Sequence, residues 1–263
     1  MTVPFYGADG SSVTALPRWR DRVLHTLLPA PCLGCGTPLP AARSSREITL
    51  GLCRGCRGRL RTVPPRGCAV CGLPLPAADL PPGWRCGACR DDRPAFDRLL
   101  ALWSYEEPFA AVIQALKFRR LDYLGRHLGE ALAHHYAGEL AGGLDLVVPV
   151  PLHWRRRLHR GYNQAERIAR PLAARLGLPV APVLRRIRST PPQSLLGKAA
   201  RSHNLRRAFR VPRPAQVHGL RLLLVDDVAT SGATLDAAAA VLKKAGAREV
   251  VALAAGRTLV GSR

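Results

Sequence analysis

Residues 222–235, LLLVDDVATSGATL, decide the fold of this chain. The stretch begins with a short apolar run, which is typical of a strand buried on both faces. Asp226 and Asp227 follow, and small residues continue to Thr234. Apolar residues then recur at helical spacing up to Gly246, namely Leu235, Ala238, Ala239, Leu242 and Ala245. The stretch therefore predicts a strand over 222–225, a polar loop over 226–233 and a helix.

The rest of the second half repeats this alternation. Residues 146–150 and 250–253 predict two further buried strands. Helices are expected over 107–118, over 123–140 and over the stretch that ends at Gly177. Strands that alternate with helices indicate an α/β fold with a parallel sheet, in which ligands bind beyond the carboxyl ends of the strands.

The loop after Val225 has the composition of a binding site for a phosphorylated sugar. Small side chains let backbone amides and the following helix N-terminus face an anion, which suits a phosphate. Carboxylates repel a phosphate, so Asp226 and Asp227 suit sugar hydroxyls or a hydrated Mg²⁺. Asp and Thr also cap helices, but a cap needs only one such residue. The loop predicts a site for a ribose 5-phosphate.

Eight cysteines form four pairs with two residues between the members of each pair. Four-thiolate sets at this spacing are typical of zinc ribbons, so we expect two structural zinc ions. Consecutive and interleaved groupings use the same residues, and the spacing does not choose between them. The ligands are Cys32, Cys35, Cys53, Cys56, Cys68, Cys71, Cys86 and Cys89. We expect an N-terminal extension over 1–30, a small double zinc ribbon over 31–92 and the α/β domain over 93–263.

The chain is strongly basic. It has 263 residues, 40 Lys plus Arg against 18 Asp plus Glu, and a formal net charge of +22. Four of the basic residues are Lys and 36 are Arg, which fits either a bias of composition or a phosphate-rich partner. No apolar run is long enough to span a membrane, and residues 1–30 do not resemble a secretory signal. We therefore expect a cytoplasmic protein with no membrane span.

The quoted stretch resembles the signature of type I phosphoribosyltransferases, which is an apolar strand, two acids and a Thr-Gly loop. Over nearly everything after residue 31 the chain is similar to the ComF family of bacterial competence-associated proteins. The paired cysteines, 116–118 (LKF), 145–153 (DLVVPVPLH), 157–165 (RLHRGYNQA), 190–193, Asn204 and Phe209 carry this resemblance.

The resemblance implies a site for phosphoribosyl pyrophosphate with Mg²⁺. Asp226 and Asp227 correspond to the acids that contact the ribose hydroxyls or the Mg²⁺. The loop for the 5-phosphate corresponds to Ala229, Thr230, Ser231, Gly232, Ala233 and Thr234. The loop for the pyrophosphate corresponds to Pro151, Leu152 and His153, with Arg157, Arg160, Asn163 and Gln164 as nearby donors. The loop that closes over the reaction corresponds to 186–201, where Arg188, Thr190, Gln193 and Lys198 are candidates.

Two functions remain in competition. The first is Mg²⁺-dependent transfer of a phosphoribosyl group to an unidentified acceptor. Thr230 and Ser231 occupy the stretch where some purine-salvage members carry an extra acid, which makes a purine acceptor less favoured. The second is a non-catalytic accessory that binds single-stranded DNA and works with the DNA-uptake machinery. The basic charge, the ribbons and the link of the ComF family to DNA uptake motivate this alternative.

Overall fold

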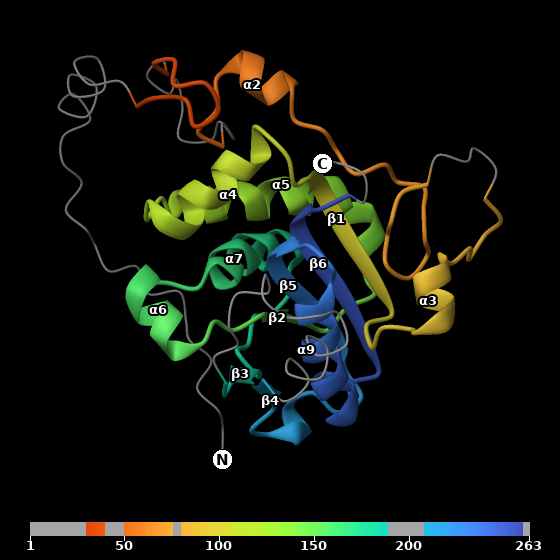
Figure 1. Cartoon of the computed structure of the whole chain (residues 1–263). Coiled ribbons are helices and arrows are strands. Elements are labelled where there is room, and N and C mark those ends of the chain that lie inside the picture. The colour runs from red at the N-terminus through yellow and green to blue at the C-terminus, as the bar shows by residue number, and fades with distance from the viewer. Residues whose placement is uncertain (1–29, 40–49, 76–79, 189–207, 260–263) are drawn as a thin grey trace.

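The centre of the molecule is a four-stranded parallel sheet with the strand order β1–β6–β5–β2 (Figure 1). The computed structural model describes residues 30–39, 50–75, 80–188 and 208–259. The strands are β1 (Arg98–Ser104), β6 (Glu249–Arg257), β5 (Arg221–Ala229) and β2 (Leu146–Pro149). Leu222 lies between Val250 of β6 and Leu146 of β2 in the register. Because all four strands run in one direction, their carboxyl ends share one edge of the sheet.

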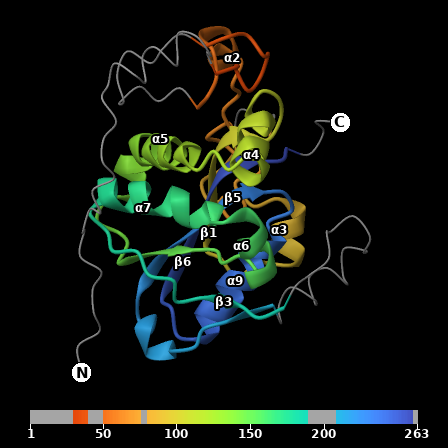
Figure 2. The same ribbon diagram turned by 90° about the vertical axis from the view of Figure 1, so that its left-hand side faces the viewer.

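Helices cover both faces of this sheet (Figures 1 and 2). On one face lie α4 (Phe109–Phe118), α5 (Tyr123–Leu140) and α7 (Gln164–Leu176). The other face carries α9 (Ala233–Lys244) and the short antiparallel pair of β3 (Arg185–Arg186) and β4 (Phe209–Arg210). The 3₁₀ turn η2 (Pro214–Gln216) lies between β4 and β5 in the chain. The short helix α6 (Trp154–Arg160) follows β2. The described core is thus two apolar layers separated by the sheet.

Glycine allows α5 and α7 to pack closely. A Cβ atom placed on Gly129 of α5 would collide with the carbonyl oxygen of Ile168 and lie 2.6 Å from Cγ of Pro171. A Cβ atom on Gly125 would lie 2.5 Å from Cβ of Arg167. The two helices therefore touch backbone to backbone, which holds α7 and the turn before it against β2.

The cysteine-rich segment covers the outer edge of the sheet. It contains the short helices α2 (Arg54–Gly58) and α3 (Gly87–Asp91). Thr62 pairs antiparallel with Trp103, and the N–H of Val63 donates to Leu102 O at 2.9 Å. The N–H of Leu99 donates to Val70 O at 2.8 Å. These bonds occupy the side of β1 that faces away from β6, so the segment satisfies backbone groups that an edge strand leaves exposed.

The expected elements are present, with changes in length. The helix expected over 123–140 has those bounds, whereas the strand expected over 222–225 extends to Ala229 and leaves only 230–232 as the turn before α9. The strand expected over 250–253 extends to Arg257. β1 and α6 were not expected, and α6 consists largely of Arg. Among the described helices, none combines the length and hydropathy that crossing a membrane requires.

Candidate functional site

Asp226 and Asp227 lie at the carboxyl end of the sheet. β5 is an inner strand, and the N–H of Val150 donates to Val225 O at 2.9 Å, so the chain after β2 stays beside the acids. Asp226 is half-buried and Asp227 is 8% exposed. Oδ1 of Asp226 accepts a hydrogen bond from the N–H of Asp227 at 2.8 Å. Both carboxylates therefore occupy the position where this class of sheet binds its ligands.

Asp226 and Asp227 lie on opposite faces of the sheet. β5 pairs with β6 residue for residue as far as Ala229, so the alternation of side chains continues through the two acids. Asp227 therefore shares the face of Leu223 and Val225, which pack in the same layer as α4, and this brings it to Lys117. Asp226 shares the opposite face with Leu222 and Leu224.

Lys117 of α4 neutralises one of the two acids. Its Nζ lies 3.0 Å from Oδ1 of Asp227, and both side chains are largely buried. Burial and the charge of Asp227 together raise the pKa of Asp226 to about 7, although the N–H of Asp227 and the charges of Lys117 and Arg186 act to lower it. Near neutral pH, Asp226 can therefore release its proton to solvent when a cation binds, and its carboxylate can accept a hydrogen bond from a hydroxyl group.

Two arginines face the same edge. The guanidinium of Arg160 stacks 5.2 Å above the ring of Phe118, and its Nη1 donates to Oε1 of Gln164 at 3.1 Å. Burial lowers the pKa of Arg160, while the charges of Asp227 and Asp226 raise it. Burial also lowers the pKa of Arg186, which feels the charge of Asp226. Both guanidinium groups stay charged and lie close enough to the acids to interact with them.

The turn between β5 and α9 is short and tight. Gly232 adopts a φ of +77°, a left-handed conformation that a side chain would strain, and the N–H of Ala233 donates to Oγ of Ser231 at 3.4 Å. α9 then begins at Ala233. The first N–H groups of a helix have no partner within the helix, so they are available to an anion at this turn. The turn sits beside Asp226 because β5 ends there.

The chain after β2 is held by two capping side chains. His153 is buried and its Nδ1 accepts the N–H of Arg155 at 3.4 Å, which starts α6. Asn163 donates to Val150 O at 3.0 Å and accepts the N–H of Ala165 at 3.2 Å, which starts α7. Arg157 is exposed. His153 and Asn163 thus shape the loop over 150–153, and the polar atoms that make these capping bonds are already occupied by the backbone.

The cysteines form two consecutive groups. The first is Cys32, Cys35, Cys53 and Cys56, the second is Cys68, Cys71, Cys86 and Cys89, and within each group all ligand atoms lie within 4.8 Å of one another. Backbone amides point at the sulfurs: Cys53 N lies 3.2 Å from Sγ of Cys32, and Cys86 N lies 3.3 Å from Sγ of Cys68. Converging thiols with amide donors suit a tetrahedral thiophilic cation. The interleaved grouping is excluded.

Arginine accompanies each cysteine group. Nη2 of Arg59, an exposed residue, lies 3.1 Å from Sγ of Cys56. Burial raises the pKa of the Cys71 thiol, and the charge of Arg257 opposes this increase. Each group therefore has one guanidinium beside it.

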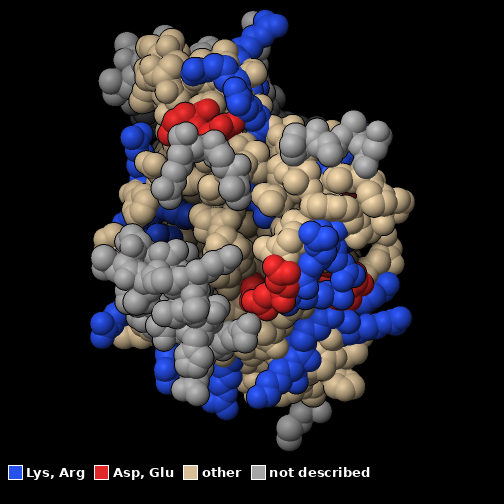
Figure 3. All heavy atoms as spheres, turned by 45° about the vertical axis from the view of Figure 1, so that its right-hand side comes forward, with Lys and Arg blue, Asp and Glu red and all other residues tan. Residues whose placement is uncertain are grey.

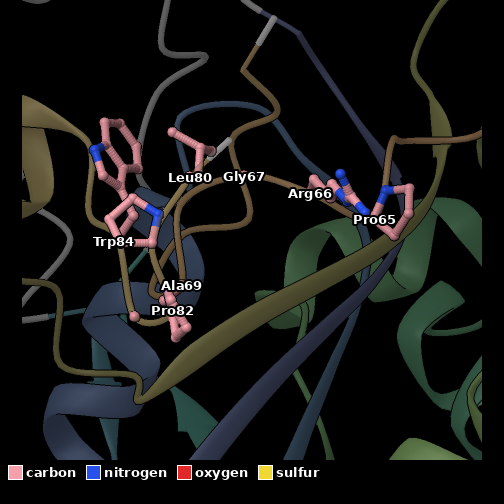
Figure 4. A pocket seen from close by; sticks show the side chains of 9 residues that line it. Pro65, Arg66, Gly67, Ala69, Leu80, Pro82 and Trp84 are labelled. Atoms are coloured by element: carbon pink, nitrogen blue, oxygen red, sulfur yellow. The ribbon is translucent and has the colours of Figure 1, made fainter. Parts of the chain in front are cut away.

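A pocket of about 680 Å³ lies in the second half of the cysteine-rich segment (Figure 4). Its walls come from residues 65–67, from Ala69 and from residues 80–84, with the rings of Pro82 and Trp84 among them. None of its lining residues belongs to β5, β2 or the turn before α9. The pocket is therefore separate from the acidic edge.

Comparison with known proteins gives the family. Residues 163–257 match the phosphoribosyl transferase domain family, and residues 23–92 match the double zinc ribbon domain family. The chain is 34% identical over 183 residues to DNA utilization protein YhgH of Salmonella typhi, which covers 68% of this chain and 80% of that protein. It is 30% identical to Competence protein F of Haemophilus influenzae, over 83% of this chain and 93% of that protein. The chain belongs to the ComF family.

Solved structures overlap the ComF chain only in part. The glutamine phosphoribosylpyrophosphate amidotransferase of B. subtilis, complexed with ADP and GMP, is 27% identical with a TM-score of 0.35. That match covers 49% of this chain and 25% of the amidotransferase. So partial a match shows nothing about the residues of the site.

The structure places the residues singled out in the ComF sequence at one edge. Asp226 and Asp227 lie near the end of β5, the turn over 230–232 follows this strand, and the loop over 151–153 follows the adjacent strand β2. Arg160 of α6 interacts with both acids and bonds to Gln164 at the start of α7. Arg157 is close in sequence but exposed. Thr190, Gln193, Lys198 and Asn204 lie outside the described residues.

Sequence reasoning included Lys117 in the stretch 116–118 that carries the ComF resemblance but gave it no place at the site. It follows the buried stripe of α4 and is one of four Lys in an Arg-rich chain. This rarity of Lys was the feature of the sequence that could have drawn attention to it. The neighbouring Phe118 is 66% exposed under Arg160. Trp103 and Phe109 are buried, with ring centroids 4.9 Å apart.

Proposed function

We propose that this chain binds phosphoribosyl pyrophosphate with Mg²⁺ at the carboxyl edge of its sheet and transfers the phosphoribosyl group to an acceptor. The observation that carries the proposal is the half-buried Asp226 next to a tight turn of small residues at a helix start. The turn suits a 5-phosphate because it offers backbone donors and no side chain that would exclude one. Asp226 suits the ribose hydroxyls or the cation because its pKa lies near neutrality.

The other residues have complementary roles in this proposal. Lys117 pairs with Asp227 and holds it in place, so one carboxylate is bonded to an ammonium and the other is available to a ligand. Arg160 and the loop over 151–153 receive the pyrophosphate, whose charge increases as it leaves. Mg²⁺, when bound, supplies positive charge to the same oxygens. The donor set of carboxylate oxygens fits this ion.

The reaction balances without an enzyme nucleophile. The bond between C1 of the ribose and the pyrophosphate oxygen breaks, and the pyrophosphate leaves with the electron pair. A lone pair of the acceptor forms the new bond to C1, and the acceptor loses its proton. Such a step passes through a cation-like sugar centre, so the protein has to hold the ribose and exclude water.

Binding of phosphoribosyl pyrophosphate by calorimetry, with and without Mg²⁺, tests the proposal. Replacing Asp226→Asn removes the charge, and losing a hydrogen bond to a charged group costs about 1.5–3 kcal/mol, or about 10- to 150-fold in affinity. Asp145→Asn is the matched control, because Asp145 pairs with Arg221 at the opposite end of β5, with 3.1 Å between Oδ1 and Nη2. Equal affinities of wild type and Asp226→Asn would refute the proposal.

Two structural zinc ions complete the proposal. The two thiol groups have the geometry of closed four-ligand sites, and neither offers an open position for catalysis. The eight thiols are free rather than paired in disulfides, which favours a reducing compartment and therefore the cytoplasm. We place the domain boundary near residue 92, after the last cysteine knuckle and before β1. Metal analysis of the purified chain is expected to give two zinc ions per molecule.

Binding of single-stranded DNA is the second candidate function. On the face shown in Figure 3, Lys and Arg side chains form several patches, among them a band at the lower right, while Asp and Glu gather in small groups. The relatives are named for competence and for DNA utilization, so a role beside the DNA-uptake machinery fits them. Affinity for single-stranded DNA that falls steeply with added salt would support this function. No binding at low salt would exclude it.

A further inference from the structure

Arg257 is a buried charge that the proposed reaction does not use. It is the last residue of β6 and is 7% exposed. Its Nε and Nη1 are buried without a hydrogen-bond partner among the described residues. Arginine stays charged in proteins, and a buried cation without an anion is strongly unfavourable. The position of Arg257 therefore calls for a nearby anion.

The nearest candidate is the second cysteine group. A Cβ atom placed on Gly72 would lie 3.7 Å from Nη1 of Arg257 and 2.5 Å from the carbonyl oxygen of Leu99. Gly72 directly follows Cys71 and has a φ of +64°, which glycine adopts without strain. Because it has no side chain, the turn that holds Cys71 can lie against both β1 and the guanidinium of Arg257. The preceding residue, Gly256, faces Phe109 on the other side of the sheet. Arg257 is thus turned toward the cysteines.

The net charge of the second cysteine group differs between its metal-free and its zinc-bound state, and Arg257 needs an anion nearby. Four neutral thiols offer no anion, whereas one Zn²⁺ with four thiolates carries a net charge of −2. None of the ion pairs among the described residues joins Asp or Glu to Arg257. The metal-bound cluster would therefore supply the counter-charge that the metal-free group lacks.

We propose that Arg257 is the charge-compensating partner of the zinc site formed by Cys68, Cys71, Cys86 and Cys89. This inference rests on the zinc content proposed above. It makes Arg257 a positioning residue: it stabilises the thiolate cluster and does not touch the substrate. Its backbone pairs with Ala229, the last residue before the turn between β5 and α9, so one residue joins the metal site to that turn.

The first cysteine group provides the internal comparison. Arg59 donates to Cys56 there, but Arg59 is exposed, so water can take its place when it is removed. Water has no such access to the buried Arg257. Loss of the guanidinium should therefore weaken the second site much more than the first.

Zinc release from the full-length, zinc-loaded protein into an excess of a chromophoric chelator tests the proposal. Removing a partner of a metal ligand commonly costs about 10- to 100-fold in metal affinity. We expect Arg257→Met to release one of its two zinc ions at least about tenfold faster than wild type. Arg257→Lys should restore much of the retention, and Arg59→Met should change release by less than about threefold. Wild-type release kinetics in Arg257→Met would overturn the proposal.

A second measurement covers the case in which Arg257→Met does not fold. Replacing zinc by ¹¹³Cd gives one resonance per site, and the resonance responds to charge and hydrogen bonding at the thiolates. We expect Arg257→Lys to move one resonance and Arg59→Lys to move the other. If Arg257→Lys leaves both resonances in place, Arg257 has no role at the metal. A wild-type chain without zinc would instead contradict the zinc proposal itself.

Discussion

Replacing Lys117→Met isolates the contribution of the ion pair at the candidate site. Nζ of Lys117 lies 3.0 Å from Oδ1 of Asp227, with 22% and 11% of the two side chains exposed. Removing one partner of a buried pair leaves an uncompensated charge and costs about 3–5 kcal/mol. Because both side chains keep some exposure, we expect a loss of about 3 kcal/mol in the free energy of unfolding.

Urea unfolding followed by circular dichroism measures this loss. The matched control is Lys243→Met, because Nζ of Lys243 lies 2.7 Å from Oδ2 of Asp97 in a pair that is 29% and 34% exposed. A pair at this exposure contributes about 0–1 kcal/mol. The double variant Lys117→Met with Asp227→Asn should recover at least half of the loss, because the unpaired carboxylate is then neutral.

The pH dependence of the Lys117→Met effect has a defined sign. Without the ammonium, the folded-state pKa of Asp226 rises further above its unfolded value of about 3.9. The folded variant therefore takes up protons as the pH falls through neutrality, so its penalty is largest at about pH 8 and smaller at about pH 6. Equal losses in Lys117→Met and Lys243→Met, or a penalty that grows as the pH falls, would refute this account of the pair.

Three further predictions concern the acid, the helix contact and the metal. Affinity for phosphoribosyl pyrophosphate with Mg²⁺ should fall below pH 7 by up to about tenfold per pH unit, because Asp226, with a pKa of about 7, must be deprotonated. Calorimetry should show that Asp226→Asn lacks this pH dependence. Gly129→Ala should lower the free energy of unfolding by about 1–3 kcal/mol because its Cβ collides with α7, whereas Gly138→Ala, with no atom within 4 Å, should raise it by up to about 1 kcal/mol. Chelation of zinc should unfold residues 50–92 before α5, because this segment has little core without its metal, and hydrogen exchange of backbone amides should show this order.

The sequence predicted the elements that carry strong periodicity. The helix over 123–140 and the buried run of β5 follow from their apolar patterns alone. The acids and the turn were found because their residue types have a chemical use at a strand end. The consecutive grouping of the cysteines was left open, since either grouping satisfies the spacing, and only the three-dimensional arrangement decides it.

The contacts that complete the site were beyond the sequence for a physical reason. Lys117 lies 110 positions before Asp227, and their pairing depends on how α4 packs over the sheet. The polar atoms of Asn163 look like ligand donors in the sequence, yet the structure uses them to hold Val150 and start α7. Arg257 gives no signal at all, because one Arg in an Arg-rich chain is inconspicuous until its burial is known.

The pairing of the cysteine-rich segment with β1 has a consequence for newly made chains. Val63 and Val70 bond to a strand whose other side is already occupied by β6. A molecule that has not yet acquired its metal would present that strand to solvent, and a bare strand recruits another copy. Metal supply during synthesis would then govern how much of the protein precipitates, even though the ions take no part in its chemistry.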